Sequence, residues 1–202
     1  MKPPRIAALY GSPRRTGNTA RLLRAAVAGA RAAGAQVEEI VLRDLKLSPC
    51  LEIYSCTTDG ECRIRDDFQR VRDLVLACGG LMLASPIFYY TVTAHTKILM
   101  DRFHSLWVKK NWVAPRPEAA PAPRRKGVFI AAGATRGRKL FEGSLLSVRY
   151  FFDTLDMDLY RSVLCRGLEH AEDVLHHPDY LEEARRAGKE LAEALRADAP
   201  GA

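Results

Sequence analysis

A loop rich in glycine, hydroxyl groups and arginine, GSPRRTGNT at residues 11–19, follows a short apolar run. Glycine at its first position allows a sharp turn out of a buried strand. If a helix follows, its first backbone N–H groups lack partners within the helix and point back at the loop. Such a helix start, together with hydroxyl and guanidinium donors, suits a phosphate monoester. The candidate donors are Ser12, Thr16, Asn18 and Thr19, with Arg14 or Arg15.

The loop differs from two common nucleotide-binding sequences. It does not end in Gly-Lys-Ser/Thr, which argues against the phosphate loop of ATP- and GTP-binding proteins. The dinucleotide fingerprint G-x-G-x-x-G is also absent from it. An ordinary strand-to-helix turn, capped by asparagine or threonine, is the alternative interpretation.

A second candidate loop, SPIFYY at residues 85–90, follows another apolar run. Pro86 fixes the backbone just after this run. Phe88, Tyr89 and Tyr90 add aromatic surface, and flat rings beside exposed backbone suit a planar heteroaromatic ligand. The alternative is an aromatic cluster that packs the loop or forms a subunit interface.

Apolar runs alternate with helical patterns along the chain, about five of each. This alternation predicts an α/β fold with a parallel sheet and helices on both faces. Ligands of such sheets bind beyond the carboxyl ends of the strands, where the strand order reverses. With the order 2-1-3-4-5, the loops at residues 11–19, 85–92 and 133–138 converge on one crevice. Strands are expected at residues 6–10, 36–42, 81–85, 127–132 and 158–164, and helices at residues 18–33, 67–78, 93–106, 144–155 and 178–197.

The chain has 202 residues, of which 48% are hydrophobic and 27% charged, the ordinary range of a globular domain. We expect one domain over residues 1–202, with loop excursions at residues 43–65 and 107–125. A linker between two domains at the second excursion is the alternative. No run of about 18 apolar residues indicates a membrane span, so no membrane association is expected. The first residues lack a long apolar segment, so we expect a cytoplasmic protein.

The net charge of the chain is +7, but the basic residues are scattered along it. A nucleic-acid-binding surface clusters its basic residues, so we expect no nucleic-acid partner. A basic surface also favours an anionic ligand or an acidic protein partner.

Three motifs together resemble those of a known protein family. They are GSPR-x-x-GNT, the cysteine loop PC…C…C-x-I-x-DD, and SPIFYY followed by K-x-x-x-DR. In this combination the chain resembles the flavodoxin-like NADPH-dependent FMN reductases, and within them the iron–sulfur flavoprotein branch. The resemblance covers nearly the whole chain, including GATRGRKLFEG at residues 133–143.

The resemblance implies a flavodoxin-like three-layer sandwich that binds FMN. The loop of residues 11–19 would hold the FMN phosphate, residues 86–89 would edge the isoalloxazine ring, and residues 133–135 would close its other side. FMN carries out the redox chemistry itself, so no catalytic acid–base residue is expected. The implied cofactor-binding residues are Ser12, Arg14, Thr16, Gly17, Asn18, Thr19, Pro86, Ile87, Phe88, Tyr89, Gly133, Ala134 and Thr135.

The resemblance also implies an NAD(P)H-dependent oxidoreductase. Reduced nicotinamide would give hydride to FMN, which would then reduce a quinone, a flavin, a metal ion or another small acceptor. Family members form dimers or tetramers, so a homodimer or homotetramer is expected. The alternatives are an FMN electron-transfer protein that accepts electrons from an acidic ferredoxin-type partner, a flavin-binding sensor, and a phosphosugar or nucleotide binder.

The cysteine loop departs from the pattern of the iron–sulfur branch, which is PC-x2-C-x2-C and a fourth cysteine several residues later. In this chain Cys50, Cys56 and Cys62 match the first, third and fourth places. Ile53 stands at the second place. A cubane cluster normally takes four thiolates, so we expect no iron–sulfur cluster and no bound metal. A cluster completed by Glu52 or by a partner subunit is the alternative.

Overall fold

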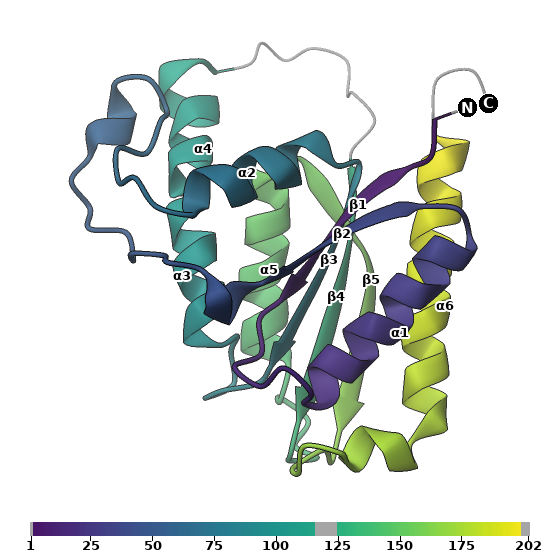
Figure 1. The fold of residues 1–202 in the computed structure, drawn as a ribbon. Coiled ribbons are helices and arrows are strands. Elements are labelled where there is room, and N and C mark those ends of the chain that lie inside the picture. Colours follow the sequence, from purple (N-terminus) through teal and green to yellow (C-terminus); the bar gives the residue numbers. More distant parts are fainter. Residues whose placement is uncertain (1, 116–124, 199–202) are drawn as a thin grey trace.

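The structure, a computed structural model, describes residues 2–115 and 125–198. A five-stranded parallel sheet forms its centre, with the strand order β2-β1-β3-β4-β5 (Figure 1). This order confirms the prediction from the sequence. The strands are β1 (Arg5–Tyr10), β2 (Gln36–Val41), β3 (Gly80–Pro86), β4 (Arg125–Gly133) and β5 (Met157–Arg166).

Helices cover both faces of the sheet, so the architecture is the predicted three-layer α/β sandwich (Figure 1). One face carries α1 (Asn18–Ala32) and α6 (Pro178–Ala197). The helices on the other face are α2 (Phe68–Ala77), α3 (Ala94–Arg102), α4 (His104–Val108) and α5 (Glu142–Thr154).

Each face of the sheet has its own apolar core, because neighbouring residues of a strand point to opposite faces. In β1, Ile6 and Ala8 belong to the core beneath α1 and α6. Ala7 and Leu9 belong to the core beneath α2 and α5. All four side chains are fully buried. Burial on both faces explains the continuous apolar runs that predicted the central strands.

The helix predicted over residues 93–106 is divided at Phe103. α3 ends one residue before Phe103, α4 begins one residue after it, and a π-helical turn continues over Lys109–Val113. At this break the buried ring of Phe103 packs edge-on against the rings of Phe68 and Phe151. Packing between α2, α4 and α5 therefore overrides the continuous helical pattern.

β5 is longer than the weak strand predicted over residues 158–164. A bulge disturbs its alternation, because its register with β4 shifts between Gly127 and Val128. Gly127 fits here because a Cβ on it would lie 2.2 Å from a ring carbon of Phe152. The edge position and the bulge explain why the sequence pattern of this strand is weak.

The predicted excursion at residues 43–65 is mostly irregular, with helical turns at Leu42–Asp44 and Ser55–Thr57. The second predicted excursion begins as helix, through Val113, and residues 116–124 of it lie outside the described residues. None of the described helices combines the length and the apolar character needed to cross a membrane.

Two glycines allow α1 and α6 to lie in close contact. A Cβ on Gly29 would lie 2.0 Å from the backbone oxygen of Arg185. A Cβ on Gly188 would lie 1.9 Å from the backbone oxygen of Ala26. Neither oxygen can move without separating the two helices.

Gly188→Ala should therefore lower the free energy of unfolding by about 2 kcal/mol, because the added methyl group overpacks the contact between the helices. Urea unfolding measures this change. Gly79→Ala is the matched control, because the atom nearest to its added Cβ is a methyl carbon of Leu195 at 3.6 Å. This control should change stability by less than about 0.5 kcal/mol. Equal stability of the two variants would contradict the close contact.

Candidate cofactor-binding site

The carboxyl ends of β1, β3, β4 and β5 meet at one end of the molecule, the lower end in Figure 1. The loops that follow these strands enclose a cavity of about 200 Å³, which we call the cofactor cavity. This is the position at which open parallel sheets bind ligands. Its lining comprises Ser12, Pro13, Arg14, Gly17, Asn18, Thr19, Pro86, Ile87, Phe88, Ala132, Gly133, Ala134, Leu168, Glu169 and Ala171.

The N-terminus of α1 reaches this cavity without a side-chain cap. Gly17 stands at the capping position, and it has no side chain that could accept hydrogen bonds from the first turn. The backbone bond from Arg21 N–H to Gly17 O, at 3.0 Å, is the first of the helical series. The N–H groups of Asn18 and Thr19 precede it, and the helix dipole adds partial positive charge there. The start of α1 is therefore suited to bind an anion.

The loop between β1 and α1 is folded around a buried serine. Ser12 Oγ accepts a hydrogen bond from Arg14 N–H at 3.0 Å, and Ser12 is only 6% exposed. Arg14 lines the cofactor cavity. Arg15 is absent from the lining and pairs with Asp44, with 2.7 Å between a guanidinium nitrogen and Oδ1. Of the two arginines that the sequence left open, Arg14 is the one at the cavity.

Buried hydrogen bonds fix the loop after β1 against the loop after β3. Thr93 Oγ1 donates to Gly11 O at 2.6 Å, and Thr93 N–H donates to Ser85 Oγ at 3.0 Å. A Cβ on Gly11 would lie 2.1 Å from Thr96 Oγ1 and 2.7 Å from Ala84 O, so glycine is required here. Sequence reasoning missed the two threonines as positioning residues because they contact Gly11, which is distant in sequence, and it missed Ser85 because this residue acts through Thr93.

The loop after β3 is a tight turn with two tyrosines at its tip. Phe88 and Thr91 exchange backbone hydrogen bonds of 2.9 and 3.0 Å. Between them, Tyr89 and Tyr90 have φ values of 48° and 62°, the left-handed conformation that a type I′ turn requires. The turn places Phe88 in the lining of the cofactor cavity, whereas Tyr89 is fully exposed and outside it.

A loop after β5, which sequence reasoning missed, also contributes to the cavity through Leu168, Glu169 and Ala171. Asn18 Nδ2 donates to His170 O at 2.7 Å, and Asn18 Oδ1 accepts from Val174 N–H at 3.1 Å. The Asn18 side chain thus ties this loop to the start of α1 and leaves its own backbone N–H for a ligand. The signal in the sequence was Gly167, which has a φ of 73° directly after β5.

Most of the predicted cofactor-binding residues come together in the lining. Three of them, Thr16, Tyr89 and Thr135, lie outside it, and their contact with a cofactor stays a prediction. Those in the lining are Ser12, Arg14, Gly17, Asn18, Thr19, Pro86, Ile87, Phe88, Gly133 and Ala134.

A larger cavity of about 560 Å³ lies between the cysteine loop and helices α3, α4 and α5. Its lining includes Cys50, His104, Trp107 and Tyr150. No residue from the start of α1 or from the loops after β1, β3 and β4 belongs to this lining. The larger cavity therefore lacks the uncapped helix start that lines the cofactor cavity.

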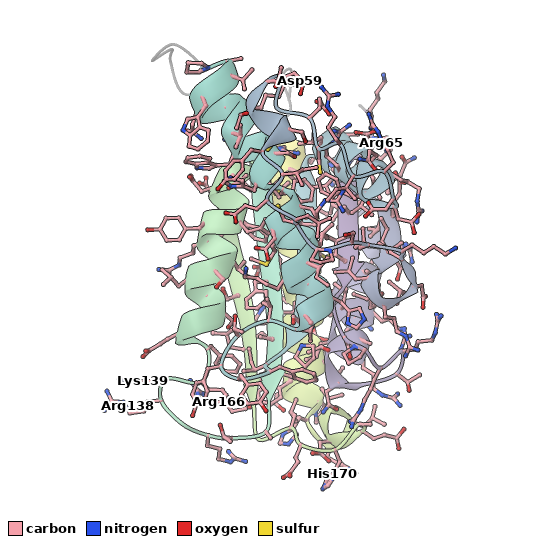
Figure 2. All side chains as sticks on the ribbon, turned by 90° about the vertical axis from the view of Figure 1, so that its left-hand side faces the viewer. Asp59, Arg65, Arg138, Lys139, Arg166 and His170 are labelled. Carbon is pink, nitrogen blue, oxygen red and sulfur yellow. The ribbon has the colours of Figure 1, made fainter. Side chains whose placement is uncertain are left out.

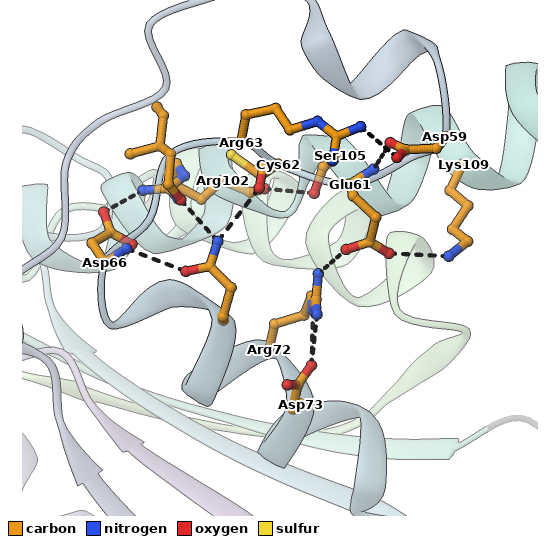
Figure 3. A network of polar contacts seen from close by, with 12 residues as sticks. Asp59, Glu61, Cys62, Arg63, Asp66, Arg72, Asp73, Arg102, Ser105 and Lys109 are labelled. Atoms are coloured by element: carbon orange, nitrogen blue, oxygen red, sulfur yellow. Dashed lines mark hydrogen bonds and ion pairs between the residues drawn. The ribbon is translucent and has the colours of Figure 1, made fainter.

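The loop with three cysteines is anchored from inside by a buried arginine (Figure 3). Arg102 is 1% exposed, and its guanidinium donates to the backbone oxygens of Ser48 and Ile64, both at 2.9 Å. It also donates to Asp66 Oδ2 at 2.6 Å. Burial alone would lower the pKa of Arg102, but Asp66 and the thiol of Cys62 beside it raise this pKa.

A second group of ion pairs holds the outer part of the same loop (Figure 3). Glu61 pairs with Arg72 and accepts a hydrogen bond from Lys109 Nζ at 3.1 Å. Burial alone would raise the pKa of Glu61, but these two cations lower it below its ordinary value. The loop is therefore held by charged contacts to α2 and to the segment that follows α4.

The arrangement of the three cysteines in this loop decides whether they could hold a metal ion. In the ranges that the structure describes, no cluster of three or more His, Cys, Asp or Glu side chains is arranged to hold a metal ion. Ile53, at the place of the missing thiolate, is 58% exposed. Asp59 in this loop lies at the opposite end of the molecule from His170, which stands between Glu169 and Ala171 of the cofactor cavity lining (Figure 2). The donor set does not fit a four-thiolate cluster.

The family model of NADPH-dependent FMN reductase matches residues 4–157, from the start of the sheet to the beginning of β5. The chain belongs to this family. This FMN reductase family member is 29% identical over 199 residues to an iron–sulfur flavoprotein of Methanocaldococcus jannaschii, a match that covers 95% of this chain and 97% of that protein. A shorter match, 36% identical over 94 residues, covers 46% of this chain and 43% of an iron–sulfur flavoprotein of Archaeoglobus fulgidus.

Solved structures confirm the flavodoxin-like fold of this family member. An NAD(P)H:quinone oxidoreductase from Methanothermobacter marburgensis superposes with a TM-score of 0.68 at 17% identity, over 94% of this chain and 98% of that chain. A flavone reductase superposes with a TM-score of 0.67 at 20% identity, over 95% of this chain and 63% of that chain. An archaeal flavodoxin superposes with a TM-score of 0.55.

Asp66→Asn should lower the free energy of unfolding at neutral pH by about 3 kcal/mol, because it leaves the buried Arg102 without its counter-charge. Burial alone would raise the pKa of Asp66, but hydrogen bonds from Arg102 and from the N–H groups of Ser48 and Phe68 lower it. The stabilisation is therefore present above the unfolded pKa of about 4 and is lost as the pH falls through the folded value. Chemical denaturation should show that the difference in unfolding free energy between the wild-type protein and Asp66→Asn becomes smaller below about pH 4.

Asp73→Asn is the control for this prediction. Asp73 pairs with Arg72 at 2.9 Å, but its side chain is 65% exposed. The substitution should cost less than about 1 kcal/mol. A loss in Asp66→Asn as small as that in the control would contradict the anchoring role of the buried pair.

Proposed function

We propose that this FMN reductase family member is an FMN-dependent oxidoreductase that takes hydride from NAD(P)H and reduces a small acceptor, such as a quinone, a flavin or a metal ion. One observation carries the proposal: the uncapped start of α1 opens into a cavity walled by the loops after β1, β3, β4 and β5. A ligand with a phosphate at one end and a flat ring at the other matches an anion position beside apolar loop surface.

The residues of the cavity fit FMN by their chemistry. Ser12, Arg14 and the first N–H groups of α1 would hold the phosphate. Residues 86–88 would lie along one edge of the ring, and residues 133–134 along the other. When bound, FMN would serve as the electron carrier, since its ring can accept a hydride and pass on the electrons. The chain binds this carrier, orients it and shields part of it from water.

Both substrates would use the same open side of the cofactor cavity. The described residues form one parallel sheet with its covering helices, and the proposed reaction uses no separate nicotinamide-binding domain. After giving its hydride, the oxidised nucleotide NAD(P)+ would therefore leave before the acceptor binds. This sequence of events produces ping-pong kinetics.

We also propose that the protein forms a homodimer or homotetramer in the cytoplasm. Trp107 on α4, and Leu146 and Tyr150 on α5, are exposed apolar side chains that a second copy could cover. We further propose that Cys50, Cys56 and Cys62 bind no iron–sulfur cluster, since Ile53 replaces the ligand that would complete four thiolates.

Anaerobic mixing of the purified protein with NADPH and with NADH tests the proposed reaction. The bound cofactor, released by heat, should be FMN. Its visible absorbance should disappear with at least one nucleotide and return when a quinone is added. A colourless protein that takes up no added FMN would overturn the proposal. Bound FMN that is reduced by a reduced ferredoxin but by neither nucleotide would assign electron transfer instead.

Gly17→Asp tests the anion position itself. The new carboxylate would accept the hydrogen bonds of the first turn of α1 and would repel a phosphate, so FMN affinity should fall on the order of 100-fold. Gly17→Ala adds the same Cβ without the charge and should bind FMN far more tightly than the aspartate variant. Titration of the apoprotein measures both affinities. Equal losses in the two variants would mean that the start of α1 does not hold the phosphate.

A further inference from the structure

A second polar cavity, of about 150 Å³, lies on the other side of the loop between β1 and α1. Ser12 and Arg14 line both this cavity and the cofactor cavity, so the two are adjacent. Arg15, Arg24 and Glu39 supply its other charged groups. We call it the arginine cavity.

Glu39, the carboxylate that lines the arginine cavity, is paired with a cation that lies outside the lining. Glu39 Oε1 lies 2.9 Å from a guanidinium nitrogen of Arg31. Glu39 also accepts a hydrogen bond from the hydroxyl of Tyr10. Burial raises the pKa of Tyr10 most, and this hydrogen bond raises it further. The hydroxyl therefore stays a neutral donor. Arg31, which is not part of the lining, therefore balances the charge of Glu39.

Two of the three arginines keep their charge available. Arg15 pairs with Asp44 at 2.7 Å. Arg24 donates a hydrogen bond to the backbone oxygen of Arg15 at 2.6 Å, which does not neutralise it. Within residues 2–115 and 125–198, neither Arg14 nor Arg24 pairs with a carboxylate. The arginine cavity thus has an excess of positive charge and a set of guanidinium donors.

We propose that the arginine cavity is a second phosphate subsite, which binds a phosphate monoester beside the cofactor cavity. Guanidinium groups bind phosphate through paired, charge-assisted hydrogen bonds. The start of α1 holds one anion in the cofactor cavity, and Arg24 holds the other, while Arg14 stands at the wall between them. Two neighbouring dianions require cations of this kind to offset their repulsion.

The subsite also predicts which nicotinamide nucleotide is preferred, and this part rests on the proposed function. NADPH differs from NADH by a 2′-phosphate, which is a phosphate monoester. Free inorganic phosphate is the other source of the same chemistry. Arg24 lines the arginine cavity and not the cofactor cavity, so its substitution separates the second phosphate from the phosphate of FMN.

The first test compares the holoprotein with its Arg24→Gln variant by initial rates with NADPH and NADH. The wild-type protein should prefer NADPH. The variant should lose about ten-fold in kcat/KM for NADPH, mostly through KM, and little for NADH, because one charge-assisted contact is removed. Arg24→Lys should restore part of the preference. FMN affinity should change far less than the preference for NADPH in both variants, because Arg24 touches the loop of residues 11–19 only through the backbone oxygen of Arg15.

Arg138→Gln is the matched control, because Arg138 is exposed at the same end of the molecule but lies outside both cavities (Figure 2). It should leave the ratio of the two kcat/KM values unchanged. The proposal would be overturned if the ratio of kcat/KM for NADPH to kcat/KM for NADH fell in Arg138→Gln and not in Arg24→Gln. That result would assign the contact with the 2′-phosphate to the loop after β4.

The second test measures binding without turnover, so that it stands if the proposed reaction fails. Adenosine 2′,5′-bisphosphate should bind the holoprotein about ten-fold more tightly than adenosine 5′-monophosphate, and Arg24→Gln should abolish the difference. Inorganic phosphate that binds as tightly as the bisphosphate, with the same dependence on Arg24, would keep the subsite and assign it to free phosphate. Equal binding of the two adenosine nucleotides, with no phosphate binding, would overturn the subsite.

Discussion

The free N–H groups at the start of α1 are the constraint on which the rest of the site depends. Helices usually satisfy some of these groups with a capping side chain, but Gly17 has none. Asn18, the next residue, uses both polar atoms of its side chain to hold the loop after β5. No neighbouring side chain therefore competes with an anion for the first turn. The first N–H groups of α1 and their partial positive charge therefore stay available to a ligand, whereas a capping side chain would satisfy them in an ordinary strand-to-helix turn.

A parallel sheet brings the other loops to this position. Because all five strands run in one direction, the loops after β1, β3, β4 and β5 begin at the same edge. Two sets of hydrogen bonds then fix them to each other, one through Thr93 and Gly11 and one through Asn18 and His170. Thr93 stands at the start of α3, whereas Arg102 at its end anchors the cysteine loop. One short helix thus joins the cofactor cavity to the loop that carries three cysteines.

The sequence predicted the fold well because each central strand is a continuous apolar run between glycine- or proline-marked loops. Most residues that it predicted to bind a cofactor lie in the cavity lining, since glycine and short polar residues are concentrated directly after β1 and the resemblance to the family supplied the others, but their contact with a cofactor stays a prediction. It missed the loop after β5, because the bulge at Gly127 weakens the pattern of that strand. It missed Thr93 because the role of this residue depends on a contact with Gly11, about 80 residues away, and it missed Ser85 because that side chain acts through Thr93. The division of the helix at Phe103 was likewise decided by packing against Phe68 and Phe151.

The most direct test of the proposed phosphate position is a titration of the apoprotein with FMN and with riboflavin. Flavin fluorescence measures the binding of each ligand. The two ligands share the ring and the ribityl chain and differ in the phosphate. FMN should bind at least about 100-fold more tightly, because its phosphate would occupy the uncapped start of α1. Equal affinity for the two ligands would contradict it, because the free N–H groups of α1 would then hold nothing.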